Sequence, residues 1–255
     1  MQDRYAGDVG DFGKFSLLRA LCADSNNKLG VVWYRLPDEN HNGDGCNIDY
    51  ISNPQYNACD EKLVNCLSKV VTGERSIAHL EKLDILPDST VYFSQTFDFH
   101  KKYTTQPKAH KAGRHNGRLQ WLNEAVKALS QCNIVFVDPD NGIEIPSIPN
   151  INQIKSGKYA YVTELKELFS GKDACIIYHH LNMNEPHEAQ VYQRAQQLKS
   201  AVPGVHSVFA LRYRPYSPKA FFVSASASFN LILKSIINDY LSGNCGFGWD
   251  TYYQV

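Results

Sequence analysis

Acidic and amide side chains follow directly after one short apolar run of this sequence. Residues 134–137 read Ile-Val-Phe-Val, and Asp138-Pro139-Asp140-Asn141-Gly142 comes next, with Glu144 close behind. An apolar run of this length is too short for a helix and predicts a strand buried on both faces of a parallel sheet. Since α/β proteins place their chemistry beyond the carboxyl ends of such strands, Asp138, Asp140 and Asn141 are candidate catalytic residues. The same residue types also build ordinary turns, so composition alone favours neither interpretation.

Two histidines follow another apolar run. Residues 174–178 predict a buried strand, and His179 and His180 come directly after it. If this strand and the one before Asp138 are parallel, the histidines reach the same edge of the sheet, where imidazole can act as an acid, a base or a metal ligand. Adjacent residues of an extended chain point to opposite sides, so at most one of them faces a shared site. We take His180 as the candidate.

The first 45 residues hold the remaining candidates. Asp11 predicts the N-cap of a helix that runs to about Ala23, and Lys14 falls in its first turn, where the helix dipole disfavours a cation. Lys14 is therefore either a functional residue or an ordinary solvent-facing lysine. A predicted strand over residues 28–36 then runs into a polar loop whose glycines, Gly43 and Gly45, allow close approach of a ligand, although the loop matches no nucleotide-binding fingerprint.

A sheet has to bring these candidates together. Apolar runs predict strands at 28–36, 90–93, 133–137, 174–178, 205–213 and 220–225. Helical spacing predicts helices at 11–23, 62–70, 77–83, 118–129, 163–169, 188–201 and 229–241, with a basic loop over 101–117. This alternation favours a single α/β domain over residues 1–255, with a mainly parallel central sheet, helices on both faces and a C-terminal strand pair.

The order of these elements resembles the methyltransferase-type Rossmann fold, and three stretches make the resemblance more specific. Tyr5-Ala6-Gly7-Asp8, Asp11 and Lys14 resemble the N-terminal His-Ala-Gly-Asn…Asp…Lys motif of the large-subunit ribosomal RNA adenine-N6 methyltransferase family. Residues 33–45 stand where that family has its first strand and glycine-rich cofactor loop, and residues 138–141 stand where it has Asp-Pro-Pro-Tyr.

The resemblance implies S-adenosylmethionine as cofactor and an adenine amine of nucleic acid as methyl acceptor, with the base flipped or single-stranded. It implies that Asp138 accepts a hydrogen bond from that amine. It places the cofactor near Tyr5, Asp8, Asp38, Asn40, Gly43 and Gly45. Here Asp140 replaces the second proline of the motif and Asn141 replaces the stacking tyrosine, and no strand that ends in a ribose-binding acid is evident between residues 99 and 119.

The same residues also suit two functions other than methyl transfer. Asp138, Asp140, Glu144 and His180 offer the oxygen and nitrogen ligands of a divalent cation such as Mg²⁺ or Mn²⁺. Such a metal would suit a nuclease or phosphodiesterase, with Lys158 steadying the charge of the phosphate. A third interpretation is a non-catalytic nucleic-acid-binding domain on the same scaffold, because a fold does not fix a function.

Basic residues are unevenly distributed, although the chain has 26 Lys and Arg against 26 Asp and Glu. No acid occurs in residues 100–118 or 189–238, and each segment carries several lysines and arginines. Together the two segments predict a surface for RNA or DNA phosphates, while a basic run is also typical of a solvated loop.

The seven cysteines are odd in number and scattered, without a C-x-x-C pair. This pattern predicts reduced thiols and neither a disulfide framework nor a zinc site. No stretch has the pattern of a signal peptide or a membrane span, so we expect a cytoplasmic protein.

Overall fold

The structure, a computed structural model, describes residues 1–24, 26–39, 43–97 and 108–255, without the side chains of 251–253. Within this part of the chain, a central sheet has the strand order β2-β1-β3-β6-β8-β7-β9. In that order the strands span Val91–Phe93, Leu29–Trp33, Ile134–Asp138, Ala174–His180, Lys219–Ala225, Ser207–Tyr213 and Trp249–Gln254. Neighbours are parallel from β2 to β6, whereas β8 is antiparallel to β6 and β7, and β9 is antiparallel to β7.

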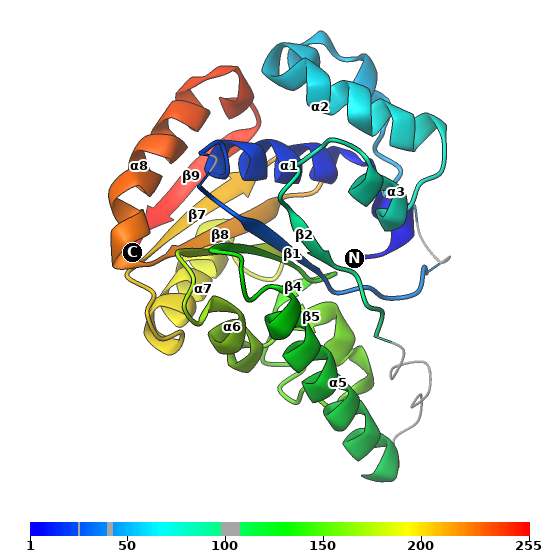
Figure 1. Ribbon diagram of the computed structural model, residues 1–255, viewed down its shortest axis with the longest axis vertical. Coiled ribbons are helices and arrows are strands. Elements are labelled where there is room, and N and C mark those ends of the chain that lie inside the picture. The colour runs from blue at the N-terminus through cyan, green and yellow to red at the C-terminus, as the bar shows by residue number, and fades with distance from the viewer. Residues whose placement is uncertain (25, 40–42, 98–107) are drawn as a thin grey trace.

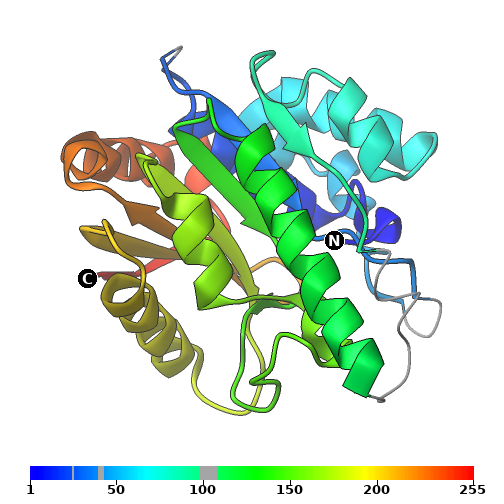
Figure 2. The ribbon, with the colours of Figure 1, turned by 60° about the horizontal axis from the view of Figure 1, so that its bottom comes forward.

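Helices cover both faces of this sheet (Figures 1 and 2). One face carries α1 (Val9–Leu21), α2 (Pro54–Thr72), α3 (Ile77–Lys82) and α8 (Ala227–Ser242). The other carries α5 (Lys108–Ala128), α6 (Val162–Phe169) and α7 (His187–Ala201). The 3-10 turns η1 to η4 span Asp3–Tyr5, Asp49–Ser52, Ile154–Lys158 and Asn244–Gly246, and a small parallel sheet joins β4 (Gly142–Ile143) to β5 (Tyr159–Ala160).

The central strands are buried on both faces. Trp33 and Phe136 belong to the core under α1, α2 and α8, while Val32 and Val137 belong to the core on the opposite side. This two-sided burial is the reason for the unbroken apolar runs in the sequence. The predicted α/β architecture is therefore confirmed, in a Rossmann-like arrangement, and the predicted C-terminal strand pair is extended by a third antiparallel strand, β9, which was not predicted.

Strand register brings four strand ends to one edge of the sheet. Trp33 pairs with Asp138, the last residues of β1 and β3, and His180 pairs with Lys219. Because β8 is antiparallel to β6, its first residue lies beside the last residue of β6. The carboxyl ends of β1, β3 and β6 thus share this edge with the amino end of β8.

Three predicted helix starts are wrong, and one of them is that of α2, which begins at Pro54 instead of residue 62. Helix α1 begins at Val9, because the side chain of Asp8 accepts a hydrogen bond from the Asp11 backbone N–H and caps the helix one turn earlier than predicted. Lys14 is therefore beyond the first turn. Helix α5 begins at Lys108, so residues 108–117 are helical instead of a loop. Their glycine, histidine and asparagine have weak helix propensity, and a tertiary contact holds this part of the helix, since Arg114 Nε donates to Asn152 O at 2.8 Å.

Cys59 in α2 and Cys245 in η4 form a disulfide, so the prediction of reduced thiols is wrong for this pair. The two residues are 186 positions apart, and only the packing of α2 against η4 brings them together. The remaining cysteines, Cys22, Cys46, Cys66, Cys132 and Cys175, are free. None of the helices in the described residues is long and apolar enough to cross a membrane.

Candidate functional site

A cavity of about 280 Å³ lies at the edge of the sheet where the four strand ends meet. This volume is close to the lower end of the range of about 300–1,000 Å³ for small-molecule pockets, so the cavity suits a ligand group the size of a nucleobase. The predicted site residues that line it are Tyr5, Asp8, Lys14, Gly43, Gly45, Asp138, Asp140, Asn141 and His180. Its wall also includes Asp11, Asp44, Tyr178, Ser217 and Lys219, which were not among the predicted site residues.

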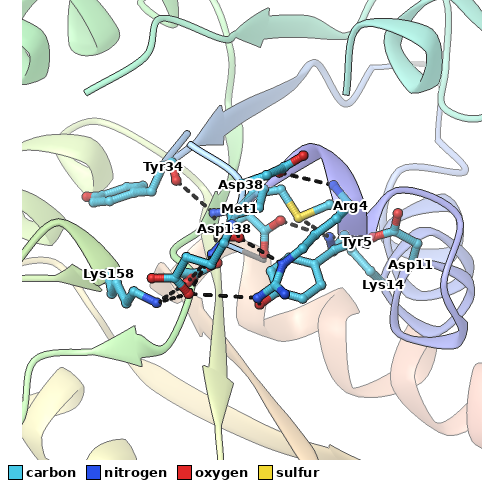
Figure 3. Close-up of polar contacts among 12 residues, drawn as sticks. Met1, Arg4, Tyr5, Asp11, Lys14, Tyr34, Asp38, Asp138 and Lys158 are labelled. Carbon is cyan, nitrogen blue, oxygen red and sulfur yellow. Dashed lines mark hydrogen bonds and ion pairs between the residues drawn. The ribbon is translucent and has the colours of Figure 1, made fainter. Parts of the chain in front are cut away.

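Lys14 connects helix α1 to the acidic turn at residues 138–141. Its Nζ donates to Asp11 Oδ1 at 2.7 Å and to Asp138 Oδ2 at 2.8 Å, and the lysine is only 4% exposed (Figure 3). Burial alone would lower the pKa of Lys14, but the two carboxylates raise it above its usual value. Lys14 therefore stays charged at neutral pH, and it is a buried bridge instead of a solvent-facing side chain.

Asp140 has a different set of partners. It accepts a hydrogen bond from Gln2 Nε2 at 3.0 Å and lies 3.3 Å from Lys158 Nζ, which also contacts Glu39 at 2.6 Å. Burial alone would raise the pKa of Asp140, but the Met1 amino group and Lys158 hold it below its usual value. Asp138 and Asp140 are thus paired with separate lysines, Lys14 and Lys158.

The N-terminal segment packs over the end of β1. The Met1 nitrogen donates to Tyr34 O at 2.7 Å, and the Arg4 backbone N–H donates to Asp38 Oδ1 at 3.2 Å. Asp38 is therefore an anchor for this segment and does not line the cavity. Gly45, with φ +85°, lies so close to it that a Cβ would come within 2.6 Å of Arg4 O. Because Gly45 has no side chain, the N-terminal segment can pack closely against it.

The two histidines face opposite sides, as predicted. His179 lies on the far side of β6, where its Nδ1 accepts a hydrogen bond from the Ile143 backbone N–H at 3.0 Å. Burial lowers the pKa of His179 to about 3, so the ring stays neutral and acts as a structural acceptor. Gly142, with φ +113°, packs directly against this ring, and a Cβ there would overlap it. His180 lines the cavity.

Asp8 is a cavity carboxylate whose pKa lies close to neutral pH. One oxygen caps α1 through the Asp11 N–H at 3.0 Å, and no ion pair within 4.0 Å holds Asp8 among the described residues. Burial, and then the nearby Asp11 carboxylate, raise the pKa of Asp8 to about 6. Asp8 can therefore exchange a proton near neutral pH, as acid–base groups in active sites do.

Some predicted residues lie elsewhere. Glu144 does not line the cavity, and its Oε1 accepts a weak hydrogen bond from Gln197 at 3.4 Å. Asn40 lies outside the described residues. In the part of the chain that the structure describes, no group of three or more His, Cys, Asp or Glu side chains is arranged to hold a metal ion. Asp138, Asp140 and His180 line the cavity and Glu144 does not, so cation binding by this set stays a prediction.

Lys219 was missed because its place in the cavity wall depends on strand order, whereas Tyr178 could have been predicted, since it lies two residues before His180 on the same side of the strand. Residues 205–213 and 220–225 predict a pair of strands. In the structure this pair is antiparallel, and Lys219, the first residue of β8, pairs with Tyr213, the last residue of β7. The sequence does not reveal that β8, instead of β7, lies next to β6. That insertion sets Lys219 beside His180.

The basic segments are only partly exposed. Arg118 is 1% exposed and donates to Glu164 at 2.6 Å, Arg114 is buried, and Arg212 pairs with Asp250 at 2.5 Å. The exposed lysines of the two segments are Lys108, Lys111, Lys199 and Lys234, and residues 100–107 lie outside the described part. The predicted phosphate-binding surface therefore loses several of its arginines to internal contacts.

Comparison of the chain with known protein families and with curated proteins finds no match.

Proposed function

We propose that this chain is an S-adenosylmethionine-dependent methyltransferase that modifies an amine of a nucleobase. The observation that carries the proposal is the meeting of three separate stretches at one cavity. These stretches are the N-terminal motif with Asp8 and Lys14, the glycine loop at 43–45, and the acidic turn at 138–141. They are the stretches through which the sequence resembles the adenine-N6 methyltransferases, and the strand order with a reversed strand next to β6 agrees with that resemblance.

The charge of the cavity wall supports a cationic cofactor. Five carboxylates line the cavity, from Asp8, Asp11, Asp44, Asp138 and Asp140, against three cations, Lys14, Lys219 and the Met1 amino group. S-adenosylmethionine carries a sulfonium and an ammonium group, and a surplus of carboxylates in a desolvated site favours both. Tyr5, Asp8 and the 43–45 loop would hold it, and it supplies an electrophilic methyl group when bound. About 280 Å³ is small for both reactants together, so the first experiment addresses the cofactor alone.

Asp138 and Asn141 supply acceptors for an exocyclic amine. Burial raises the pKa of Asp138 and the Lys14 ammonium group opposes this rise, so the carboxylate paired with Lys14 accepts hydrogen bonds in its ionised form. The Asn141 side-chain amide donates to Tyr159 OH at 3.0 Å, which fixes its orientation and leaves its carbonyl oxygen as a second acceptor. Two acceptors match the two N–H groups of an adenine or cytosine amine, and they orient its nitrogen toward the methyl donor.

Titration calorimetry of the full chain with S-adenosylmethionine tests the cofactor, and parallel titrations with Mg²⁺ and Mn²⁺ test the metal-dependent alternative. We expect saturable binding of the sulfonium cofactor in metal-free buffer. Transfer of a tritiated methyl group to single-stranded RNA and DNA oligonucleotides tests the reaction. Asp138→Ala should lower the transfer rate about 10- to 100-fold, because a hydrogen bond to a charged group contributes a free energy that corresponds to a factor of this size. Asp239→Ala, which changes an exposed carboxylate, should not lower the rate. Binding of metal without the cofactor, or full activity of Asp138→Ala, would refute the proposal.

A further inference from the structure

The wall of the cavity has two chemically different sides. The side made by α1 and the end of β3 carries the carboxylates of Asp11, Asp138 and Asp140, which accept hydrogen bonds. The second side is made by the neighbouring strands β6 and β8, and it carries Tyr178, His180 and Lys219. These three side chains donate hydrogen bonds, so the second side needs a ligand group with acceptor atoms.

Lys219 is a buried cation without a carboxylate partner. It is 7% exposed, and its Nζ donates to Ser217 O and to Ser217 Oγ, each at 3.0 Å. Among the described residues no carboxylate oxygen lies within 4.0 Å of this nitrogen, in contrast to Lys14. Burial lowers the pKa of Lys219, and Asp8 acts on it only through space. A buried ammonium group with neutral partners alone is costly, and a bound anion would remove that cost.

His180 and Tyr178 face the same space as Lys219. His180 is the register partner of Lys219 across the antiparallel pair, and Tyr178 is two residues before His180 on the same side of β6. Neither the Tyr178 hydroxyl nor the His180 ring has a hydrogen-bond partner among the described residues, although both side chains line the cavity. Burial lowers the pKa of His180, so its neutral ring keeps one N–H donor.

We propose that Lys219, His180 and Tyr178 form a subsite for an anionic oxygen group, and that this group is the phosphate of the nucleotide whose base reaches Asp138. The assignment to a nucleotide rests on the proposed function, while the anion subsite itself does not. A phosphate accepts several charge-assisted hydrogen bonds at once, and the cavity offers a lysine and two neutral donors on one side. The acids on the other side repel phosphate, which fixes the direction in which a nucleotide enters.

Binding of adenosine and of its 5′- and 3′-monophosphates tests the subsite by titration calorimetry, with inorganic phosphate as a competitor. For the unmodified chain we expect one of the monophosphates to bind about 10- to 100-fold more tightly than adenosine. Charge-assisted hydrogen bonds to one phosphate provide a gain in affinity of this size. Lys219→Met should abolish this difference. Lys166→Met, which removes an exposed lysine of α6 outside the cavity and both basic segments, should preserve it.

Tyr178→Phe removes a single hydroxyl and keeps the packing of the ring against Phe221, so it tests the subsite even if Lys219→Met fails to fold. It should lower the preference for the monophosphate several-fold, with an unchanged melting temperature. Equal binding of adenosine and both monophosphates by the unmodified chain would overturn the proposal. An unchanged preference in both Lys219→Met and Tyr178→Phe would overturn it as well.

A second comparison separates the phosphate from the carboxylate of the cofactor. S-adenosylmethionine carries a carboxylate that 5′-methylthioadenosine lacks. If Lys219→Met weakens only the binding of S-adenosylmethionine and leaves the preference for the monophosphate intact, the nucleotide assignment is wrong. If the monophosphate preference depends on Lys219 and no S-adenosylmethionine binds, the anion subsite stands and the proposed methyl transfer fails.

Discussion

Substitution of Lys14 by methionine removes the cation between two buried carboxylates. The side chains of Asp11 and Asp138 are 2% and 4% exposed, so neither can turn to water for compensation. Loss of one partner from a buried ion pair costs about 3–5 kcal/mol, because the remaining charge stays desolvated. Domains of this kind have a total stability of about 5–15 kcal/mol, so Lys14→Met should lose a large part of the free energy of unfolding.

Urea unfolding followed by circular dichroism measures this loss at pH 7 and at pH 5. The raised pKa of Lys14 means that its contribution is complete below the ordinary lysine pKa of about 10.4 and is lost only at higher pH, so the lysine itself does not titrate in this window. In Lys14→Met the unpaired carboxylates take up protons as the pH falls. The destabilisation should therefore be smaller at pH 5 than at pH 7.

Two further variants isolate the cause. Lys14→Met combined with Asp138→Asn should recover part of the lost stability, because one of the two uncompensated charges is gone. Lys62→Met breaks an exposed pair with Asp84, at 57% and 60% exposure, and should leave stability unchanged. A loss below about 1 kcal/mol for Lys14→Met, or no recovery in the double variant, would contradict a buried charge bridge.

Three other outcomes follow from the same contacts. Gly142→Ala should lower the melting temperature far more than Gly171→Ala, since both residues have positive φ but only Gly142 packs against a side chain; equal losses would contradict this contact. The Asp8 carboxyl should titrate with a midpoint near 6 in carbon-detected NMR. Because that pKa is raised on folding, the Asp8 contribution to stability should fall as the pH rises from about 4 to 6, and Asp8→Asn should remove this dependence. Reduction of the Cys59–Cys245 disulfide should cost roughly 2–5 kcal/mol in urea unfolding, and non-reduced peptide mapping should recover the linked pair.

Local sequence patterns determined most of the sheet. The strand at 134–138 is recognisable because both of its faces are buried, and such burial leaves an unbroken apolar run in the sequence. The alternation of an extended chain likewise separates His179 from His180 without knowledge of the fold. Both features depend on neighbouring residues alone, and for that reason they can be predicted.

Contacts between distant segments decided the rest. Lys14 joins Asp138 across 124 positions, and Cys59 joins Cys245 across 186, with no spacing pattern that marks either pair. Lys219 faces the cavity only because the reversed strand β8 is inserted beside β6. The sequence by itself therefore determined the buried strands and the carboxylates that follow them, but not the strand β9 or the short strands β4 and β5. Which cations those carboxylates meet was decided by strand order and helix packing, because pairing over such distances depends on the whole fold.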